Sequence, residues 1–433
     1  MMSGLQDLSF ADSNRIDARQ LVRLQAQLAY LQQASPYYRE KFAQLGIRVQ
    51  DFGQLGDLAQ LPLTTKADLA ARNPDFLAVD MEQVVDICQT SGTTGEPVTI
   101  WQTESDLQRL ALNEQTAFTA AGIVPSDRVL IGAALDRGFM AGLAYFLGLR
   151  NIGATAIRAG SGQPALLSQL ILNQRPNVLV GVPSLFLAVA RRFKAAGIDA
   201  ATLGVTKLIC IGEPVRNPDL SLSLLGEALS GGWAAQVFST YASTEMATAF
   251  ADCTAACGGH LLPELMVIEI LDDAGRALPA GEPGEVVATP LGLTGTPLLR
   301  YRTGDIASLH PETCACGRQT PRLGPIRGRK AQMLKYRGTT LFPAAISNVL
   351  HTIEAVTGHY LEVECEFDLS DRLRVVVGSS DSSLTAERVA ELIAAGTRVK
   401  PEVVMVSPAE ILEKTILPDR RKPVTFFDYR ELN

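Results

Sequence analysis

Short apolar runs alternate with amphipathic segments along the first half of this chain. The runs favour buried strands because they are rich in Val, Ile and Leu and end at turn-forming residues; they cover residues 129–132, 154–157, 178–182, 207–212 and 236–238. The segments between them have apolar residues at helical spacing and cover residues 140–149, 164–173, 183–196 and 218–229. Strands that are apolar on both faces and joined through helices predict an α/β fold whose sheets are mostly parallel and covered by helices.

The pattern changes after Tyr241. Alternating apolar positions in residues 265–271 and 285–289, on either side of the turn Asp272-Asp273-Ala274-Gly275, predict a small antiparallel β unit. This unit is expected to belong to the same large N-terminal domain.

Beyond Gly338 the elements become shorter and predict a smaller α+β unit. Helical spacing covers residues 343–353 and 384–395, strand patterns cover residues 361–367, 372–377 and 403–405, and a loop is expected over residues 414–422. We place the boundary at Gly328-Arg329, which gives domains of residues 1–328 and 329–433.

Composition narrows the classes of function. The 433 residues are 47% hydrophobic, which is enough for more than one domain. The net charge of −7 gives no support for a nucleic-acid partner. No apolar run reaches membrane-spanning length and the first ten residues lack a signal-peptide pattern, so we expect a cytoplasmic protein without a membrane partner. Seven cysteines, an odd number, argue against a disulfide framework.

A loop of small and hydroxyl-bearing residues lies between two predicted strands, residues 84–88 and 98–101. It reads Thr-Ser-Gly-Thr-Thr-Gly-Glu-Pro and begins at Thr90. Its glycines let backbone N–H groups turn toward an anion, and its hydroxyls can donate to phosphate oxygens. An ordinary hairpin loop explains the same string equally well, and no Walker lysine follows. The candidate phosphate ligands are Thr90, Ser91, Gly92, Thr93, Thr94 and Gly95.

Three further stretches stand in order behind this loop: Tyr241-Ala242-Ser243-Thr244-Glu245, Tyr301-Arg302-Thr303-Gly304-Asp305 and Arg421-Lys422-Pro423. Together the four resemble the adenylate-forming superfamily of acyl-CoA synthetases, luciferases and peptide-synthetase adenylation domains. The short length, Ile211-Gly212-Glu213-Pro214 and Cys314-Ala315-Cys316-Gly317-Arg318 make the chain most similar to the phenylacetate–CoA ligase branch. Each motif is weak alone, but four in this order are specific.

The resemblance implies an AMP-forming carboxylate–CoA ligase that uses ATP and Mg²⁺. A carboxylate attacks the α-phosphate of ATP, pyrophosphate leaves, and the thiol of CoA then displaces AMP from the acyl-adenylate. An alternative is an enzyme that delivers the acyl group to a carrier protein, or transfers AMP, as coenzyme F390 synthetase-like relatives do. The branch also implies a homodimer.

The same resemblance implies roles for individual residues. Lys422, Thr244 and Glu245 match the catalytic lysine, a phosphate-binding hydroxyl and the carboxylate that holds Mg²⁺. Asp305 matches the acceptor of both ribose hydroxyls, and Arg329 matches an arginine near the ribose and the α-phosphate. The remaining matches to the nucleotide site are Gly212, Glu213, Pro214, Tyr241, Ala242 and Ser243.

Members of this superfamily rotate their C-terminal domain between the two half-reactions. The hinge is expected near Ala331, which lacks the polar side chain usual at that position. The acyl pocket is expected to include Arg137, Phe139 and Met140. We therefore expect an aromatic or arylalkyl acid, although the charge of Arg137 distinguishes the pocket from one made for phenylacetate.

Four residues provide candidate ligands for a structural Zn²⁺. Cys253 and His260 follow Glu245 in sequence, while Cys314 and Cys316 follow Asp305. Three thiolates and an imidazole suit closed tetrahedral zinc, with Cys257 as an alternative to His260. Reduced cysteines packed as small apolar residues are the competing interpretation. These loops are rich in glycine and polar residues, which favours the metal.

Overall fold

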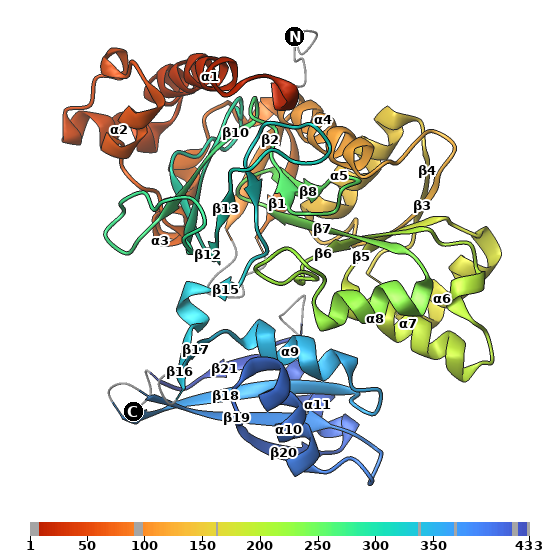
Figure 1. Ribbon diagram of the computed structural model, residues 1–433. Helices are drawn as coiled ribbons and strands as arrows, with labels where there is room; N and C mark the ends of the chain where they lie inside the picture. Colours follow the sequence, from red (N-terminus) through yellow and green to blue (C-terminus); the bar gives the residue numbers. More distant parts are fainter. Residues whose placement is uncertain are drawn as a thin grey trace.

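A nine-stranded sheet with helices on both faces forms the centre of the larger lobe. The computed structural model describes residues 8–90, 98–161, 163–336, 339–367, 370–417 and 423–430. The strand order is β13-β14-β9-β8-β7-β6-β5-β3-β4. This lobe is the upper one in Figure 1, and a smaller lobe lies below it.

One half of this sheet is parallel, as the sequence predicts. Its strands are β3 (Arg128–Gly132), β4 (Thr155–Arg158), β5 (Val178–Gly181), β6 (Lys207–Ile211) and β7 (Gln236–Ser243). An antiparallel half extends it through β8 (Thr248–Asp252), β9 (Gly259–His260), β14 (Arg322–Leu323) and β13 (Leu309–His310). The sequence did not predict this extension, because strands of two residues carry no periodic signal.

Successive strand residues pack against different helices. Val129 and Ile131 lie in the cluster with α4 (Glu104–Ala120) and α5 (Met140–Ile152). Leu130 lies in the opposite cluster, which is formed with α6 (Pro164–Gln174), α7 (Pro183–Ala195) and α8 (Leu224–Trp233). This alternation is expected of a strand buried on both faces.

The start that we predicted for α8, Pro218, is wrong. Asn217 instead opens a turn in which its N–H donates to the carbonyl of Ser221 at 2.9 Å. The helix begins at Leu224, where Ser223 caps it by accepting from the N–H of Gly226 at 3.3 Å. Apolar residues at helical spacing extended the prediction too far because local turn bonds compete with the helix.

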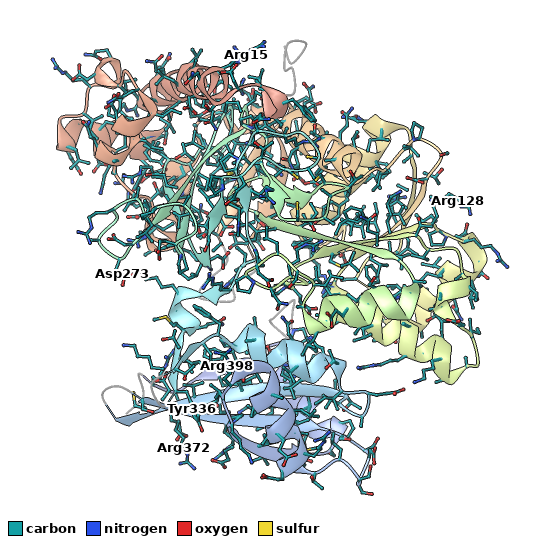
Figure 2. All side chains as sticks on the ribbon, viewed as in Figure 1. Arg15, Arg128, Asp273, Tyr336, Arg372 and Arg398 are labelled. Carbon is teal, nitrogen blue, oxygen red and sulfur yellow. The ribbon has the colours of Figure 1, made fainter. Side chains whose placement is uncertain are left out.

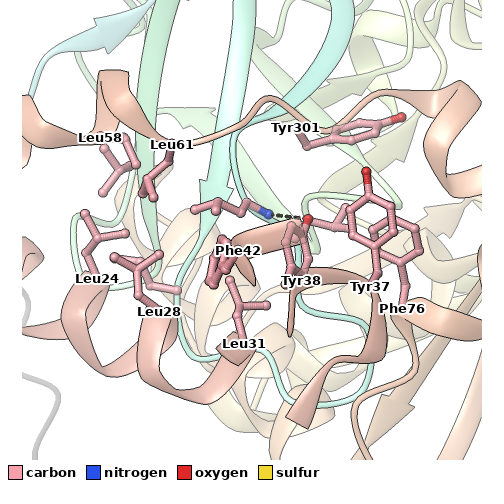
Figure 3. Packing of buried hydrophobic residues seen from close by; sticks show 14 of the residues in the cluster. Leu24, Leu28, Leu31, Tyr37, Tyr38, Phe42, Leu58, Leu61, Phe76 and Tyr301 are labelled. Atoms are coloured by element: carbon pink, nitrogen blue, oxygen red, sulfur yellow. Dashed lines mark hydrogen bonds between the residues drawn. The ribbon is translucent and has the colours of Figure 1, made fainter. Parts of the chain in front are cut away.

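A second sheet in the larger lobe is antiparallel, as predicted, with the order β10-β11-β12-β15. Its strands are β10 (Met266–Leu271), β11 (Gly284–Pro290), β12 (Tyr301–Ala307) and β15 (Gly328–Arg329). The helices α1 (Ser13–Ala34), α2 (Pro36–Leu45) and α3 (Lys66–Ala71) lie beside it. Figure 3 shows the aromatic cluster between α2 and Tyr301 of β12. The strands β1 (Val84–Gln89) and β2 (Thr99–Thr103) pair as a separate hairpin.

The smaller lobe has its own sheet, ordered β20-β19-β18-β21, and its own apolar cluster. The strands of this sheet are β18 (Gly358–Phe367), β19 (Ser370–Gly378), β20 (Glu402–Val406) and β21 (Phe426–Asp428). Two further strands of the lobe, β16 (Leu334–Tyr336) and β17 (Thr339–Leu341), pair with each other. Its helices are α9 (Pro343–Thr352), α10 (Ala386–Thr397) and α11 (Pro408–Thr415). Because α11 ends at Thr415, the loop predicted from residue 414 begins later than expected. The sequence analysis did not predict α11, whose start is marked by the capping box of Ser407 and Glu410.

The segment that connects the lobes is anchored by charged neighbours of Ala331. Lys330 Nζ lies 2.5 Å from Asp273 Oδ1 and 3.5 Å from Glu285 Oε2 in the larger lobe. From the smaller lobe, Arg430 Nη2 donates to the carbonyl of Ala331 at 3.2 Å. These contacts hold the connecting segment through Lys330 and the backbone of Ala331, while a hinge near Ala331 stays a prediction.

Short 3₁₀ helices complete the description: Leu8–Phe10, Val49–Asp51, Leu55–Gln60, Asn73–Phe76, Met81–Gln83, Ala200–Thr202 and Lys330–Gln332. Charged side chains such as Arg15, Arg128 and Arg372 project outward from the two lobes (Figure 2). Within the described ranges, no helix has the length and apolar character needed to cross a membrane.

Candidate nucleotide site and cysteine cluster

The loops that follow β6 and β7 lie side by side at the carboxyl edge of the parallel strands. Ile211, the last residue of β6, pairs with Thr240 of β7. Gly212 therefore leaves the sheet beside Tyr241, which stays in β7 and pairs with Phe250 of β8. Gly212 has a φ of 75°, a left-handed conformation that costs glycine little and lets the chain turn immediately after the strand. The fold thus brings together two stretches that the resemblance matches to the nucleotide site.

Glu213 supports its own loop in this structure. Its carboxylate accepts hydrogen bonds from the N–H and the hydroxyl of Ser184, at 2.9 and 2.8 Å. Ser184 lies in the first turn of α7, where backbone N–H groups lack helical partners. These bonds fix residues 212–214 to α7, while a nucleotide contact from Glu213 stays a prediction.

Asp305 lies next to Tyr241 although 63 residues separate them in sequence. The Tyr241 hydroxyl donates to Asp305 Oδ2 at 2.8 Å. Arg329 pairs with Asp305 across β12 and β15, and its Nε lies 3.6 Å from Asp305 Oδ1. Burial raises the pKa of the Asp305 carboxyl, and the charge of Arg329 opposes that rise. Burial, followed by the charge of Asp305, raises the pKa of Tyr241, which keeps its hydroxyl protonated.

Glu245 accepts a hydrogen bond from a second tyrosine. The Tyr301 hydroxyl donates to Glu245 Oε1 at 3.1 Å, and Tyr301 itself is only 2% exposed. Thr244 and Glu245 are half-buried. We did not predict Tyr301 as a site residue. Its position as the first residue of the stretch that ends in Asp305 was the available signal.

Part of the predicted site lies outside the described residues. These residues are Ser91, Gly92, Thr93, Thr94, Gly95 and Lys422. Thr90 is described, and it closes the neck of the loop: its N–H donates to the Val98 carbonyl, and its Oγ1 accepts from the Val98 N–H, both at 3.0 Å. The strand–loop–strand arrangement predicted around this loop is confirmed by the pairing of β1 with β2.

The predicted acyl-pocket residues are adjacent to this hairpin. The carbonyl of Gly138 accepts from the N–H of Gln89 at 2.9 Å, which places residues 137–139 beside β1. Arg137 is exposed, with Nε 3.5 Å from Asp136 Oδ2. Met140 is 5% exposed and packs in one cluster with Ala247, close in sequence to Glu245.

The cysteine-rich loops meet in space. One ligand atom each from Cys253, His260, Cys314 and Cys316 lies within 4.8 Å of all the others. Cys253 Sγ is 3.6 Å from Cys314 Sγ, and Cys316 Sγ is 3.6 Å from His260 Nε2. Tetrahedral zinc with Zn–S bonds of about 2.3 Å separates its sulfur ligands by roughly 3.8 Å, so these atoms have suitable spacing.

Cys257 lies at the edge of this group. Its Sγ is 3.5 Å from Cys314 Sγ, but Arg322 Nη1 donates to it at 3.2 Å and to its carbonyl at 2.6 Å. An arginine donor alone does not exclude a ligand, since Arg318 Nη1 also donates to Cys316 Sγ at 3.4 Å. Cys257 is, however, not among the four residues whose ligand atoms all lie within 4.8 Å of one another. Of the two sets that the sequence left open, the geometry favours the one with His260.

These features, an α/β lobe with nucleotide-binding motifs at one sheet edge and a smaller α+β lobe, define an adenylate-forming enzyme. Residues 22–294 match the family model of AMP-binding enzymes, and the chain belongs to that family. It is an AMP-forming acyl-CoA ligase: it adenylates a carboxylic acid with ATP and then forms the CoA thioester.

The chain is similar to phenylacetate–coenzyme A ligases over most of its length. The chain is 30% identical over 362 residues to the phenylacetate–coenzyme A ligase of Thermus thermophilus, with coverage of 82% of this chain and 79% of the relative. It is 32% identical over 396 residues to that of Escherichia coli, with coverage of 88% and 86%.

Among solved structures, the fold is similar to that of a 2-hydroxyisobutyryl-CoA ligase. The TM-score is 0.83 for that ligase in the postadenylation state, at 23% identity and with coverage of 98% of this chain and 91% of the other. It is 0.70 for the same ligase in the thioesterification state, at 25% identity and with coverage of 98% and 92%.

Proposed function

We propose that this ligase activates aromatic or arylalkyl carboxylic acids at the edge where Tyr241, Glu245, Asp305 and Arg329 meet. That meeting is the observation that carries the proposal, because segments far apart in sequence supply donors and acceptors suited to a nucleotide. The relatives support the substrate class: they include phenylacetate, feruloyl and salicylyl ligases. Phe139 and Met140 would limit the pocket to acids of moderate size.

Each residue has a role that its chemistry permits. Asp305 would accept the ribose hydroxyls, with Arg329 beside it near the α-phosphate. Tyr241 would lie against the adenine, and Thr244 would donate to phosphate. Carboxylate oxygens are the ligands that Mg²⁺ prefers, so Glu245 would hold the ion that neutralises charge on the phosphates.

A panel of acids tests the substrate class. We expect phenylacetate-sized aromatic acids to drive pyrophosphate release at least tenfold faster, in kcat/KM, than acetate or palmitate, because an aromatic ring fills a pocket of that size. A preference for palmitate would contradict the proposal. Adding CoA to the assay tests the alternative acceptors: adenylation that yields no thioester in the presence of CoA would favour a carrier protein or AMP transfer. One relative, a salicylyl-CoA synthase / salicylate adenylyltransferase, gives this alternative its support.

Lys422 provides a test of the two half-reactions. We propose that its ammonium group stabilises charge where the carboxylate meets the α-phosphate. Lys422→Ala should lower the rate of adenylation at least a hundredfold, while a supplied acyl-adenylate is still converted to the thioester. Pyrophosphate exchange and thioester formation measured separately give the result, with Lys414→Ala as a lysine control. Equal loss in both steps would reject this role.

We also propose that Cys253, His260, Cys314 and Cys316 hold a structural Zn²⁺. All four coordination positions would be filled by protein, which leaves no open position for catalysis. Protein purified without added metal should contain about one equivalent of zinc by elemental analysis. Less than a tenth of an equivalent, roughly, in fully stable protein would leave the cysteines as packing residues.

The two lobes support a functional division into residues 1–328 and 329–433, with the second unit acting as a rotating lid. Each lobe has its own sheet and cluster, as expected of units that move as bodies. We also propose a homodimer, which light scattering at micromolar concentration would detect.

A further inference from the structure

Two hydrogen bonds connect the stretch 241–245 to the stretch 301–305, one donated from each side. In each stretch a tyrosine stands four residues before a carboxylate: Tyr241 before Glu245, and Tyr301 before Asp305. Each tyrosine donates to the carboxylate of the other stretch, Tyr241 to Asp305 at 2.8 Å and Tyr301 to Glu245 at 3.1 Å. Neither carboxylate is therefore oriented only by its own segment.

Tyr301 is the more buried of the two donors. It is 2% exposed and packs in the cluster with Tyr38 and Leu61 (Figure 3), whereas Tyr241 is half-buried. At its backbone, the N–H of Thr64 donates to the Arg300 carbonyl at 3.1 Å and the N–H of Arg302 donates to the Thr64 carbonyl at 2.9 Å. A ring fixed in this way gives its hydroxyl one position.

The Tyr301 hydroxyl donates to a single oxygen of Glu245. Its bond occupies Oε1 of Glu245, and no hydrogen bond to Oε2 is present among the residues that the structure describes. One oxygen is thus held by the protein while the other stays available.

We propose that Tyr301 is a positioning residue that orients Glu245 so that Oε2 can bind the Mg²⁺ of ATP. The inference rests on the proposed role of Glu245. Packing in the core requires only the ring of Tyr301, whereas this inference gives its hydroxyl a part in Mg²⁺ binding. Phenylalanine would fill the same space in the cluster, so Tyr301→Phe removes only the hydroxyl.

The test compares ATP with AMP, because AMP binds without Mg²⁺. Calorimetric titrations without any carboxylic acid would give the affinity for AMP, and the affinity for ATP over a range of Mg²⁺ concentrations. Loss of a hydrogen bond to a charged group is expected to raise the Mg²⁺ concentration for half-maximal ATP binding roughly tenfold in Tyr301→Phe. Its AMP affinity and melting temperature should stay near those of the wild type. Tyr241→Phe, the matched control, should weaken AMP and ATP alike through Asp305.

The double variant Tyr301→Phe/Glu245→Gln separates this role from a general structural one. If Tyr301 acts through Glu245, the double variant should need no more Mg²⁺ than Glu245→Gln alone. Equal weakening of AMP and ATP in Tyr301→Phe, or no change in either, would overturn the inference. If Glu245→Gln shifts the Mg²⁺ requirement and Tyr301→Phe does not, only the role of Tyr301 fails. If Glu245→Gln itself has no effect, the Mg²⁺ assignment fails and the inference falls with it.

Discussion

Glu114 of α4 is a carboxyl group shielded almost completely from solvent. It is 3% exposed, and the Asn113 amide donates to its Oε1 at 3.0 Å. It lines a cavity of about 10 Å³ together with Tyr145 and Thr240. A cavity of this volume has room for a single water. Within the described part of the chain, Thr240 Oγ1 has no hydrogen-bond partner, and it faces this cavity as a polar group that such a water can bond. Burial raises the pKa of Glu114 to about 7.

This shift predicts that stability falls as pH rises. Between the unfolded pKa of 4.5 and the folded value of about 7, the folded state binds more protons than the unfolded state. The free energy of unfolding should therefore decrease by about 2–3 kcal/mol from pH 5 to pH 8 through this group. Urea denaturation at both values checks it. Glu114→Gln should remove that part of the pH dependence and the exposed Glu104→Gln should not; an unchanged slope in Glu114→Gln would contradict the prediction.

At the scale of elements, the cysteine cluster joins two hairpins and the N-terminal segment. Cys253 comes from the connection of β8 to β9 and His260 from β9 itself, whereas Cys314 and Cys316 come from the connection of β13 to β14. Next to the cluster, the N–H of Gln319 donates to the Ser9 carbonyl at 2.6 Å, and the guanidinium of Arg318 lies 4.7 Å from the ring centre of Phe10. Loss of the ligands would loosen all three segments.

Removing one ligand should lower stability before activity. Cys316→Ser is expected to abolish the stoichiometric zinc and to lower the melting temperature by several degrees, because metal-binding energy contributes to folding. Hydrogen exchange should increase in residues 253–260 and 314–320, while kcat at low temperature stays within twofold. Cys365→Ser changes an exposed cysteine of the smaller lobe and serves as the control. A variant that keeps wild-type stability would show that no metal supports these loops.

At the scale of the whole molecule, two polar contacts connect the lobes away from the segment that joins them. Arg191 Nη2 donates to the carbonyl of His351, near the end of α9, at 2.6 Å, and Lys194 Nζ lies 3.1 Å from Glu354 Oε1. Both cations belong to α7, and they border a cleft of about 530 Å³ between the lobes.

Weakening these contacts should shift the balance between lobe arrangements. The Lys194–Glu354 pair is exposed and contributes little, whereas Arg191 is half-buried and donates to a helix-terminal carbonyl. Arg191→Ala is expected to change the ratio of the adenylation rate to the rate of thioester formation from a supplied adenylate two- to tenfold, since it removes a contact present in this lobe arrangement. Single-turnover rates for each step give the ratio, and Arg192→Ala on the same helix is the control. An unchanged ratio would show that Arg191 does not bias the arrangement of the lobes.

The amino-acid sequence was sufficient to predict the parallel strands, most helices and the order of the nucleotide motifs. Apolar runs and helical spacing are local signals, and a five-residue stretch such as Tyr301 to Asp305 can be recognised from the sequence alone. The same signals failed at α8 and at the two-residue strands, where local turn bonds or distant partners decide the conformation.

Only the tertiary structure decided which groups meet. It joined Tyr241 to Asp305 and Tyr301 to Glu245, assigned Glu213 to Ser184, and favoured His260 over Cys257. It also buried the Arg109 guanidinium against the carbonyls of Leu291, Ala247 and Leu265. These pairings depend on strand register and on contacts between residues far apart in the chain, and a linear pattern of apolar and polar positions carries no information about either.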